Sequence, residues 1–268
     1  MLLFKFRYLI TPILFLFILS CSKVNVGGPA GPKGPYGPIG DSSITGPIYG
    51  KVFLYDSLGD PMSDNSGASV VFENSSLLIR LLTQADGSFS VSSAPAGVYD
   101  ISISKDGYGP MKLFHFEHTG GINASQTGRI ELGRQLSSHY DIKNLQVVPM
   151  TFNQVHVMYI TITLAHPQSL PNAEVLLYMS HAPGVGNSSN DYVFRTNYFQ
   201  TNDSTLVFSP FNTPPSFYSD KLDVDSLYMA AAIDNPRLFS YTDSAGNMVF
   251  PAAGNLSNEV KVYNNLKD

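Results

Sequence analysis

The chain has 268 residues and is mildly acidic, with 16 Lys and Arg against 21 Asp and Glu and a net charge of −5. Nucleic-acid binding depends mainly on clustered basic residues that neutralise phosphates, so this composition argues against a nucleic-acid partner. The sequence contains one cysteine, which excludes an intramolecular disulfide, and stability must therefore come from packed cores.

The first twenty residues have the features of an export signal. Lys5 and Arg7 form a short basic segment, and residues 8–20 are uncharged and mostly apolar. This stretch is shorter than the ~20 apolar residues of a membrane-spanning helix, but it fits the apolar part of a signal peptide. We therefore predict a signal peptide over residues 1–20.

The signal ends in Ile-Leu-Ser-Cys at residues 18–21, which resembles the lipobox of bacterial lipoproteins. The resemblance implies cleavage before Cys21 and acylation of that cysteine, and two or three acyl chains hold a protein firmly to a membrane. We expect a lipid anchor in the cell envelope, at the outer membrane. The alternatives are an ordinary signal peptide with a stray cysteine, or an uncleaved anchor.

Residues 28–42 contain glycine at every third position, followed by proline in all but the last triplet. This pattern resembles collagen, where only glycine fits at the crowded axis of the triple helix. A polyproline-type spacer, extended at ~3.1 Å per residue, explains the same pattern. We expect residues 21–45 to form such a spacer rather than a trimerising stalk.

Strand signals dominate residues 46–134, and no stretch in this range has convincing helical periodicity. Apolar and polar residues alternate, and turn sequences of the Asp-Gly type separate the alternating runs. The predicted strands are residues 50–55, 68–72, 88–91, 97–103, 111–116 and 129–132.

The order of turn and core residues in this region resembles the carboxypeptidase regulatory-like domain. The residues that carry the resemblance are Gly50, Val52, Asp56, Gly59, Pro61, Gly67, Ala68, Val70, Thr83, Asp86, Gly87, Phe89, Gly97, Tyr99, Gly107 and Tyr108. The family implies a transthyretin-like β-sandwich, common on surface and periplasmic proteins of Bacteroidetes, and it implies architecture rather than activity. The apolar stretch 76–82 departs from the family pattern, where a variable strand or a loop is expected.

The strand-and-turn pattern continues through residues 137–264. This spacing is typical of an immunoglobulin-like or fibronectin type III-like sandwich, and residues 255–262 resemble the last strand of the latter. We therefore predict an all-β chain with two tandem β-sandwich domains after the signal peptide and the Gly/Pro linker. The predicted strands of the second domain are residues 140–148, 155–164, 173–180, 192–200, 205–209, 226–233 and 258–263.

Motifs of known catalytic sites are missing from the sequence. It lacks His-Glu-x-x-His, Gly-x-Ser-x-Gly and a phosphate-binding loop. Acylation of Cys21 would leave no cysteine to act as a nucleophile. His115 and Glu117 would share one face of a strand and His118 the other, and two ligands do not complete a zinc site. We expect an exposed strand end there, no metal, no cofactor and no enzymatic activity.

Aromatic residues concentrate between residues 192 and 218. Phe211, Phe217 and Tyr218 flank loop prolines, so they are our candidate ligand contacts, because exposed aromatic rings stack on sugar rings. The alternative is that aromatics of this region fill the sandwich core. The absence of tryptophan weakens the carbohydrate interpretation.

Four serines follow an aspartate and precede an apolar residue or threonine, which resembles the O-glycosylation sequon of secreted Bacteroidetes proteins. Because Asp-Ser is also favoured in turns, local structure is the alternative explanation. The candidate O-glycosylation sites are Ser57, Ser204, Ser226 and Ser244.

Together these patterns predict a non-enzymatic, membrane-anchored lipoprotein of the cell envelope that presents a binding or adhesion surface to a glycan or protein ligand. The alternative is a carbohydrate-binding accessory lipoprotein of a glycan uptake system, and a third hypothesis is an enzyme with an unrecognised site. Since binding residues concentrate on loops, the longer loops of the second domain are the expected location of the surface.

Overall fold

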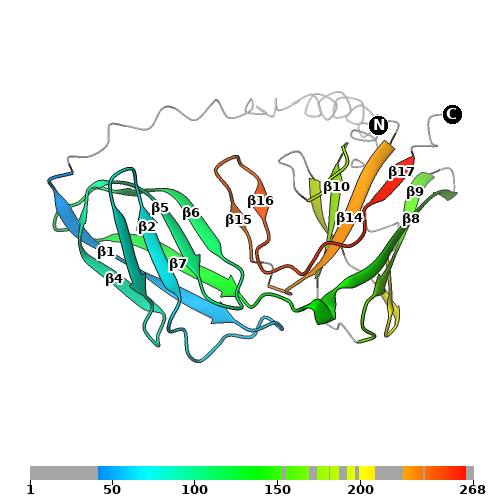
Figure 1. The fold of residues 1–268 in the computed structure, drawn as a ribbon, viewed down its shortest axis with the longest axis horizontal. Helices are drawn as coiled ribbons and strands as arrows, with labels where there is room; N and C mark the ends of the chain where they lie inside the picture. Colours follow the sequence, from blue (N-terminus) through cyan, green and yellow to red (C-terminus); the bar gives the residue numbers. More distant parts are fainter. Residues whose placement is uncertain are drawn as a thin grey trace, which may run out of the picture. The chain divides into compact units, whose positions relative to one another are not determined.

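A computed structural model describes residues 42–152, 155–168, 174–180, 182–186, 192–196, 199–208, 226–237 and 239–263. These residues form strands and turns, with one described 3-10 helix at Ser138–Tyr140, so the all-β prediction is confirmed (Figure 1). Within the described residues, no helix has the length and apolar character needed to cross a membrane. Cys21, residues 22–41 of the predicted linker, Phe211, Phe217 and Tyr218 lie outside the described residues.

The first sandwich consists of a three-stranded sheet in the order β4-β1-β7 and a four-stranded sheet in the order β3-β2-β5-β6 (Figure 1). Strand β1 pairs with β4 antiparallel and with β7 parallel. The strands are β1 (Thr45–Tyr55), β2 (Ser69–Glu73), β3 (Leu78–Leu82), β4 (Ser88–Pro95), β5 (Gly97–Ser104), β6 (Met111–His118) and β7 (Ser125–Gly133).

The core of this sandwich is built from the inward-facing residues of both sheets. Phe72 of β2 is fully buried, and its ring meets three other rings edge-on, those of Phe89, Tyr99 and Phe116, at centroid distances of 6.2, 6.1 and 6.4 Å. Edge-to-face contacts of this kind add to the stabilisation from burying apolar area. All six predicted strands are present.

Residues 78–82 of the apolar stretch 76–82 form strand β3 at the edge of the four-stranded sheet. Ile79 and Leu81 pack partly against the core, whereas Leu78 and Leu82 are 47% and 61% exposed. The alternation of partly buried and exposed residues is that of an edge strand with one face on the core. The choice between strand and loop is therefore settled in favour of a strand.

The second sandwich pairs a sheet in the order β11-β10-β14-β17 with a sheet in the order β12-β13-β9-β8. Apolar residues of both sheets form its core. The strands are β8 (Ile142–Phe152), β9 (Val155–Leu164), β10 (Glu174–Ser180), β11 (Tyr192–Thr196), β12 (Phe199–Asn202), β13 (Thr205–Phe208), β14 (Ser226–Asp234) and β17 (Val260–Tyr263).

The single strand predicted over residues 192–200 is wrong. The chain forms β11 in one sheet and β12 in the other, since Phe194 pairs with Leu177 of β10 and Phe199 pairs with Val207 of β13. Both halves have alternating sequence, and alternation alone does not reveal that a chain crosses between sheets.

A segment of the second sandwich contacts the first. The connection after β14 leads to a short hairpin, β15 (Tyr241–Thr242) and β16 (Met248–Val249), which the sequence did not predict. Before the hairpin, the ring of Phe239 lies 5.3 Å from that of Tyr55, measured between centroids. A Cβ on Gly133 would lie 2.0 Å from the Phe239 ring, so only glycine fits there. The end of the first domain at residue 134 and the start of the second at residue 137 stay predictions.

Candidate functional site

The outer face of the three-stranded sheet contains a groove of about 820 Å³. Its walls come from the neighbouring strands β1, β4 and β7, and from the end of β3 with the connection to β4. We call it the β1 groove. Its lining includes Tyr49, Lys51, Phe53, Leu82, Ser88, Gln126 and Arg129.

Alternation along β1 places three of these side chains on one face. Tyr49, Lys51 and Phe53 are at least partly exposed, while Ile48 and Val52 between and beside them are fully buried in the core. Successive side chains of a strand point to opposite faces, so burying the even-numbered residues presents the odd-numbered ones to the groove.

A bulge in β7 brings its side chains to the same face. Tyr49 pairs with Gln126 and Lys51 pairs with Arg129, so two steps along β1 correspond to three along β7. The extra residue is accommodated at Gly128, whose φ of 78° is in the left-handed region. Without it, the period of two would turn either Gln126 or Arg129 into the core.

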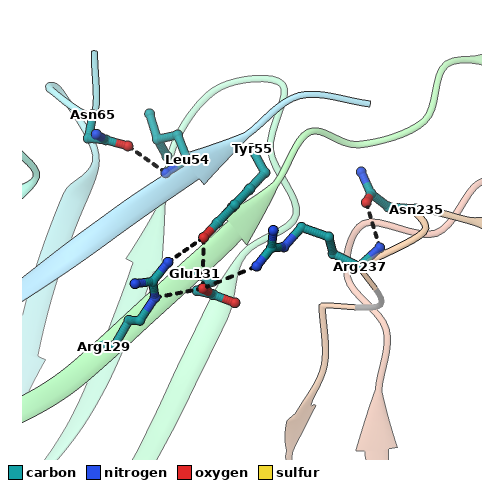
Figure 2. A network of polar contacts seen from close by, with 7 residues as sticks. All are labelled: Leu54, Tyr55, Asn65, Arg129, Glu131, Asn235 and Arg237. Atoms are coloured by element: carbon teal, nitrogen blue, oxygen red, sulfur yellow. Dashed lines mark hydrogen bonds and ion pairs between the residues drawn. The ribbon is translucent and has the colours of Figure 1, made fainter. Parts of the chain in front are cut away.

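Arg129 is held by three contacts, and Figure 2 shows the two hydrogen bonds among them. Its Nε donates to Oε1 of Glu131 at 2.7 Å, and its Nη2 donates to the hydroxyl of Tyr55 at 2.5 Å. Its Cζ lies 4.1 Å from the centroid of the Phe53 ring. The hydrogen bond to Glu131, then that to Tyr55, raises the pKa of Arg129 above its ordinary value.

Glu131 is the acceptor at the centre of this network (Figure 2). The Tyr55 hydroxyl donates to the same Oε1 atom at 2.8 Å. Burial works to raise the pKa of Glu131, but the hydrogen bonds from Tyr55 and Arg129 outweigh burial and hold it below its ordinary value. The carboxylate is therefore ionised at neutral pH and fixes the guanidinium of Arg129.

Lys51 is positioned by an ion pair at the groove. Its Nζ lies 3.1 Å from Oδ2 of Asp86, in the turn before β4. The side chain and the amide of Ser88, and then Lys51, hold the pKa of Asp86 far below its ordinary value. Both partners are more than half exposed, so the pair orients Lys51 more than it stabilises the fold.

A residue of the second sandwich joins the network (Figure 2). The Arg237 guanidinium lies 4.2 Å from the centroid of the Tyr55 ring, and its Nη2 lies 4.0 Å from Oε1 of Glu131. The Arg237 amide donates to Oδ1 of Asn235, whose Nδ2 donates to the carbonyl of Asp56 at 2.8 Å. The polar cluster beside the groove is therefore shared by both sandwiches.

The chemistry of the lining is that of recognition. Tyr49 offers an aromatic ring that is 43% exposed. The lining adds amide, hydroxyl and cationic side chains, among them Gln84, Ser90 and Arg129. An exposed ring beside hydrogen-bonding groups on a regular sheet can stack on a ligand and orient it.

The residues around His115 do not gather around a metal position. Among the described residues, no group of three His, Cys, Asp or Glu side chains could hold a metal ion. His118 is buried, which corrects the prediction of an exposed strand end, and its ring nitrogens bond Ser125 Oγ and the Ala94 carbonyl. His115 is exposed at a bulge with a φ of 59°.

Two of the four predicted glycosylation motifs occupy turns with the same hydrogen bonds. Oδ1 of Asp56 accepts from the amides of Leu58 and Asp60, and Oδ1 of Asp243 accepts from those of Ala245 and Asn247. Turn formation therefore accounts for both aspartates. Ser244 is exposed, Ser57 and Ser204 are partly exposed, and the Ser226 side chain lies outside the described part, so glycosylation stays a prediction.

Sequence reasoning missed the β1 groove because it sought ligand contacts on long loops. The signal was present: a Tyr, a Lys and a Phe at alternate positions of the first strand, opposite a segment with Arg129. The pairing of β1 with β7 joins residues about eighty apart in the sequence, and parallel pairing at that separation has no local signal.

No protein-family model and no curated protein matches this sequence. Among solved structures, the chain is similar to a candidate carbohydrate-binding protein from Bacteroides uniformis, with 15% identity over 81% of this chain and 98% of that one, at a TM-score of 0.26. It is also similar to a DUF3823 family protein from Bacteroides ovatus, with 13% identity over 82% and 98% and a TM-score of 0.29. The BcpA major pilin subunit of Bacillus cereus matches with 12% identity over 82% and 69% and a TM-score of 0.28.

These TM-scores decide neither a fold family nor a function for this chain. The resemblance to the carboxypeptidase regulatory-like domain stays a prediction.

Replacing Gly128 by Ala tests the bulge that aligns the groove. The position has a φ of 78° and nothing within 4 Å of an added Cβ, so the penalty is backbone strain alone. We expect the free energy of unfolding to fall by about 1 kcal/mol, measured by urea denaturation. Gly97→Ala is the control, because its φ is not left-handed and its nearest neighbours lie at 3.6 Å. Equal effects of the two changes would contradict the strained bulge.

Proposed function

We propose that the protein is a non-enzymatic lipoprotein of the cell envelope that binds its ligand in the β1 groove. The observation that carries this proposal is the exposed ring of Tyr49 beside Lys51, Gln126 and Arg129 on one face of a regular sheet. These side chains come from strands, and Arg129 is fixed by Glu131 and Tyr55, so the surface is preorganised. Preorganisation lowers the entropy lost on binding.

A glycan is the ligand class that these side chains favour. Sugar rings present a face that stacks on an aromatic ring, and hydroxyls that pair with amide and hydroxyl side chains. The groove supplies a ring at Tyr49 and amides at Gln84 and Gln126. We therefore propose that carbohydrate binds to the first sandwich and not to the loops that carry Phe211, Phe217 and Tyr218.

A protein ligand is the second candidate, favoured by a different feature. Strand β3 is the edge of its sheet, with Leu78 and Leu82 47% and 61% exposed. Unpaired edges with apolar side chains can accept a strand from another protein. In the adhesion role, the exposed edge of β3 would be the surface that binds the partner protein.

The proposal also includes the route to the membrane. Cleavage before Cys21 and acylation of that cysteine would anchor the protein, at the outer membrane, and the residues between Cys21 and β1 would act as the spacer. The support is the lipobox-like sequence and the Gly/Pro repeat. The first sandwich would then be a carboxypeptidase regulatory-like domain used as a binding module.

Cys21→Ser tests the anchor. Acylation would be the only covalent lipid, so we expect the variant to incorporate no radiolabelled palmitate and to leave the membrane fraction. Both are measured on whole cells and on fractions separated by centrifugation. Equal labelling of variant and wild type would contradict the lipoprotein proposal.

Tyr49→Ala tests the groove on a glycan array. We expect the array signal of the full chain to fall about tenfold, since losing a stacked ring and the apolar area it buries costs on the order of 1.5 kcal/mol. Tyr159→Ala is the matched control, because Tyr159 is 39% exposed against 43% for Tyr49 and lies in β9 of the second sandwich. A loss of signal with both variants, or with Tyr159→Ala alone, would overturn the groove as the binding site.

A further inference from the structure

The β1 groove has basic side chains in an acidic protein. Lys51 and Arg129 line it and no lining residue is acidic, although the chain has a net charge of −5. The carboxylates that pair with these cations, Asp86 and Glu131, are not part of the lining. A ligand in the groove therefore contacts the cationic member of each pair.

Arg129 keeps capacity for a further contact. In its pair with Glu131 the arginine side chain is the more exposed member, at 57% against 32%. Nε and Nη2 are used by Glu131 and Tyr55, and no residue in the described part of the chain bonds Nη1. A planar guanidinium that is already fixed loses little freedom when it binds a carboxylate.

The cations lie beside the stacking ring. Lys51 is two residues from Tyr49 on the same face of β1, and Arg129 is the cross-strand partner of Lys51. Gln126 is the cross-strand partner of Tyr49, so an amide lies beside the ring. A sugar ring stacked on Tyr49 would have its substituents within reach of both an amide and a cation, because neighbouring strands lie about 5 Å apart.

We propose that the β1 groove binds oligosaccharides that contain uronic acids, with Tyr49 against the sugar ring and with Arg129 and Lys51 on the sugar carboxylate. The inference rests on the proposed function and adds the charge class of the ligand. An acidic peptide would match the charge but offers no sugar face to Tyr49, so it serves as an alternative that the experiment measures.

The experiment compares sugars that differ only in charge. The full chain, purified in detergent, is titrated by calorimetry with short oligomers of galacturonic, glucuronic and mannuronic acid and with their methyl esters. Esterification keeps the sugar rings and hydroxyls but removes the negative charge. We expect at least one acid to bind about tenfold or more tighter than its ester, because hydrogen bonds between charged groups are the stronger ones.

Variants assign the charge effect to the groove. Arg129→Gln and Lys51→Gln should each weaken binding of the acid about tenfold more than binding of the ester, so the ratio of the two affinities falls about tenfold. Arg80→Gln is the control, because it removes the same charge from an exposed position of β3 on the other sheet. Lys51→Gln is the variant less exposed to a folding defect, because among the described residues the Lys51 side chain bonds only the exposed Asp86. Thermal unfolding of every variant is measured alongside.

Four results would overturn the inference. Binding of no acid better than its ester would exclude a carboxylate contact, and this failure leaves the proposed function intact if Tyr49→Ala still weakens binding of the ester about tenfold. An equal loss with Arg80→Gln would indicate nonspecific attraction to charge. Binding of polyglutamate as tightly as the acids would assign the groove to acidic peptides. Binding that is insensitive to Tyr49→Ala would overturn the proposed function as well.

Discussion

The carboxylate of Glu131 is the interaction on which the arrangement of the β1 groove depends. It accepts from Tyr55 and Arg129 through one oxygen, and Arg237 of the second sandwich lies 4.0 Å from the same atom. Even partial burial of a carboxylate is costly unless hydrogen bonds and opposite charges compensate it, and here both do. The compensation fixes Arg129 beside the groove and connects the groove to the segment that carries Arg237 and Phe239.

Backbone geometry works together with this network. The bulge at Gly128 turns Gln126 and Arg129 to the same face, and Glu131 then lies on that face opposite Phe53. The side chains inside the sheet, such as Ile130 and Leu132, remain in the core. A single extra residue in β7 thus reconciles a packed interior with a polar outer surface.

Much of the fold was readable from the sequence, because alternation and turn residues mark strands locally. Residues 97–103 were predicted as a strand and form β5, and residues 155–164 match β9. The break between β11 and β12, the β15–β16 hairpin and the parallel pairing of β1 with β7 were not readable, because they depend on contacts between distant residues. The groove was missed for the same reason, since it forms only when β7 lies beside β1.

The most direct test of the account is where a ligand contacts the protein. Nuclear magnetic resonance of the isotopically labelled chain, with a glycan that binds it, reports which amide signals shift on binding. We predict that the largest shifts occur at Tyr49, Gln126 and Arg129 and extend through Glu131. Large shifts confined to Phe211, Phe217 and Tyr218, with none in β1 or β7, would contradict the account.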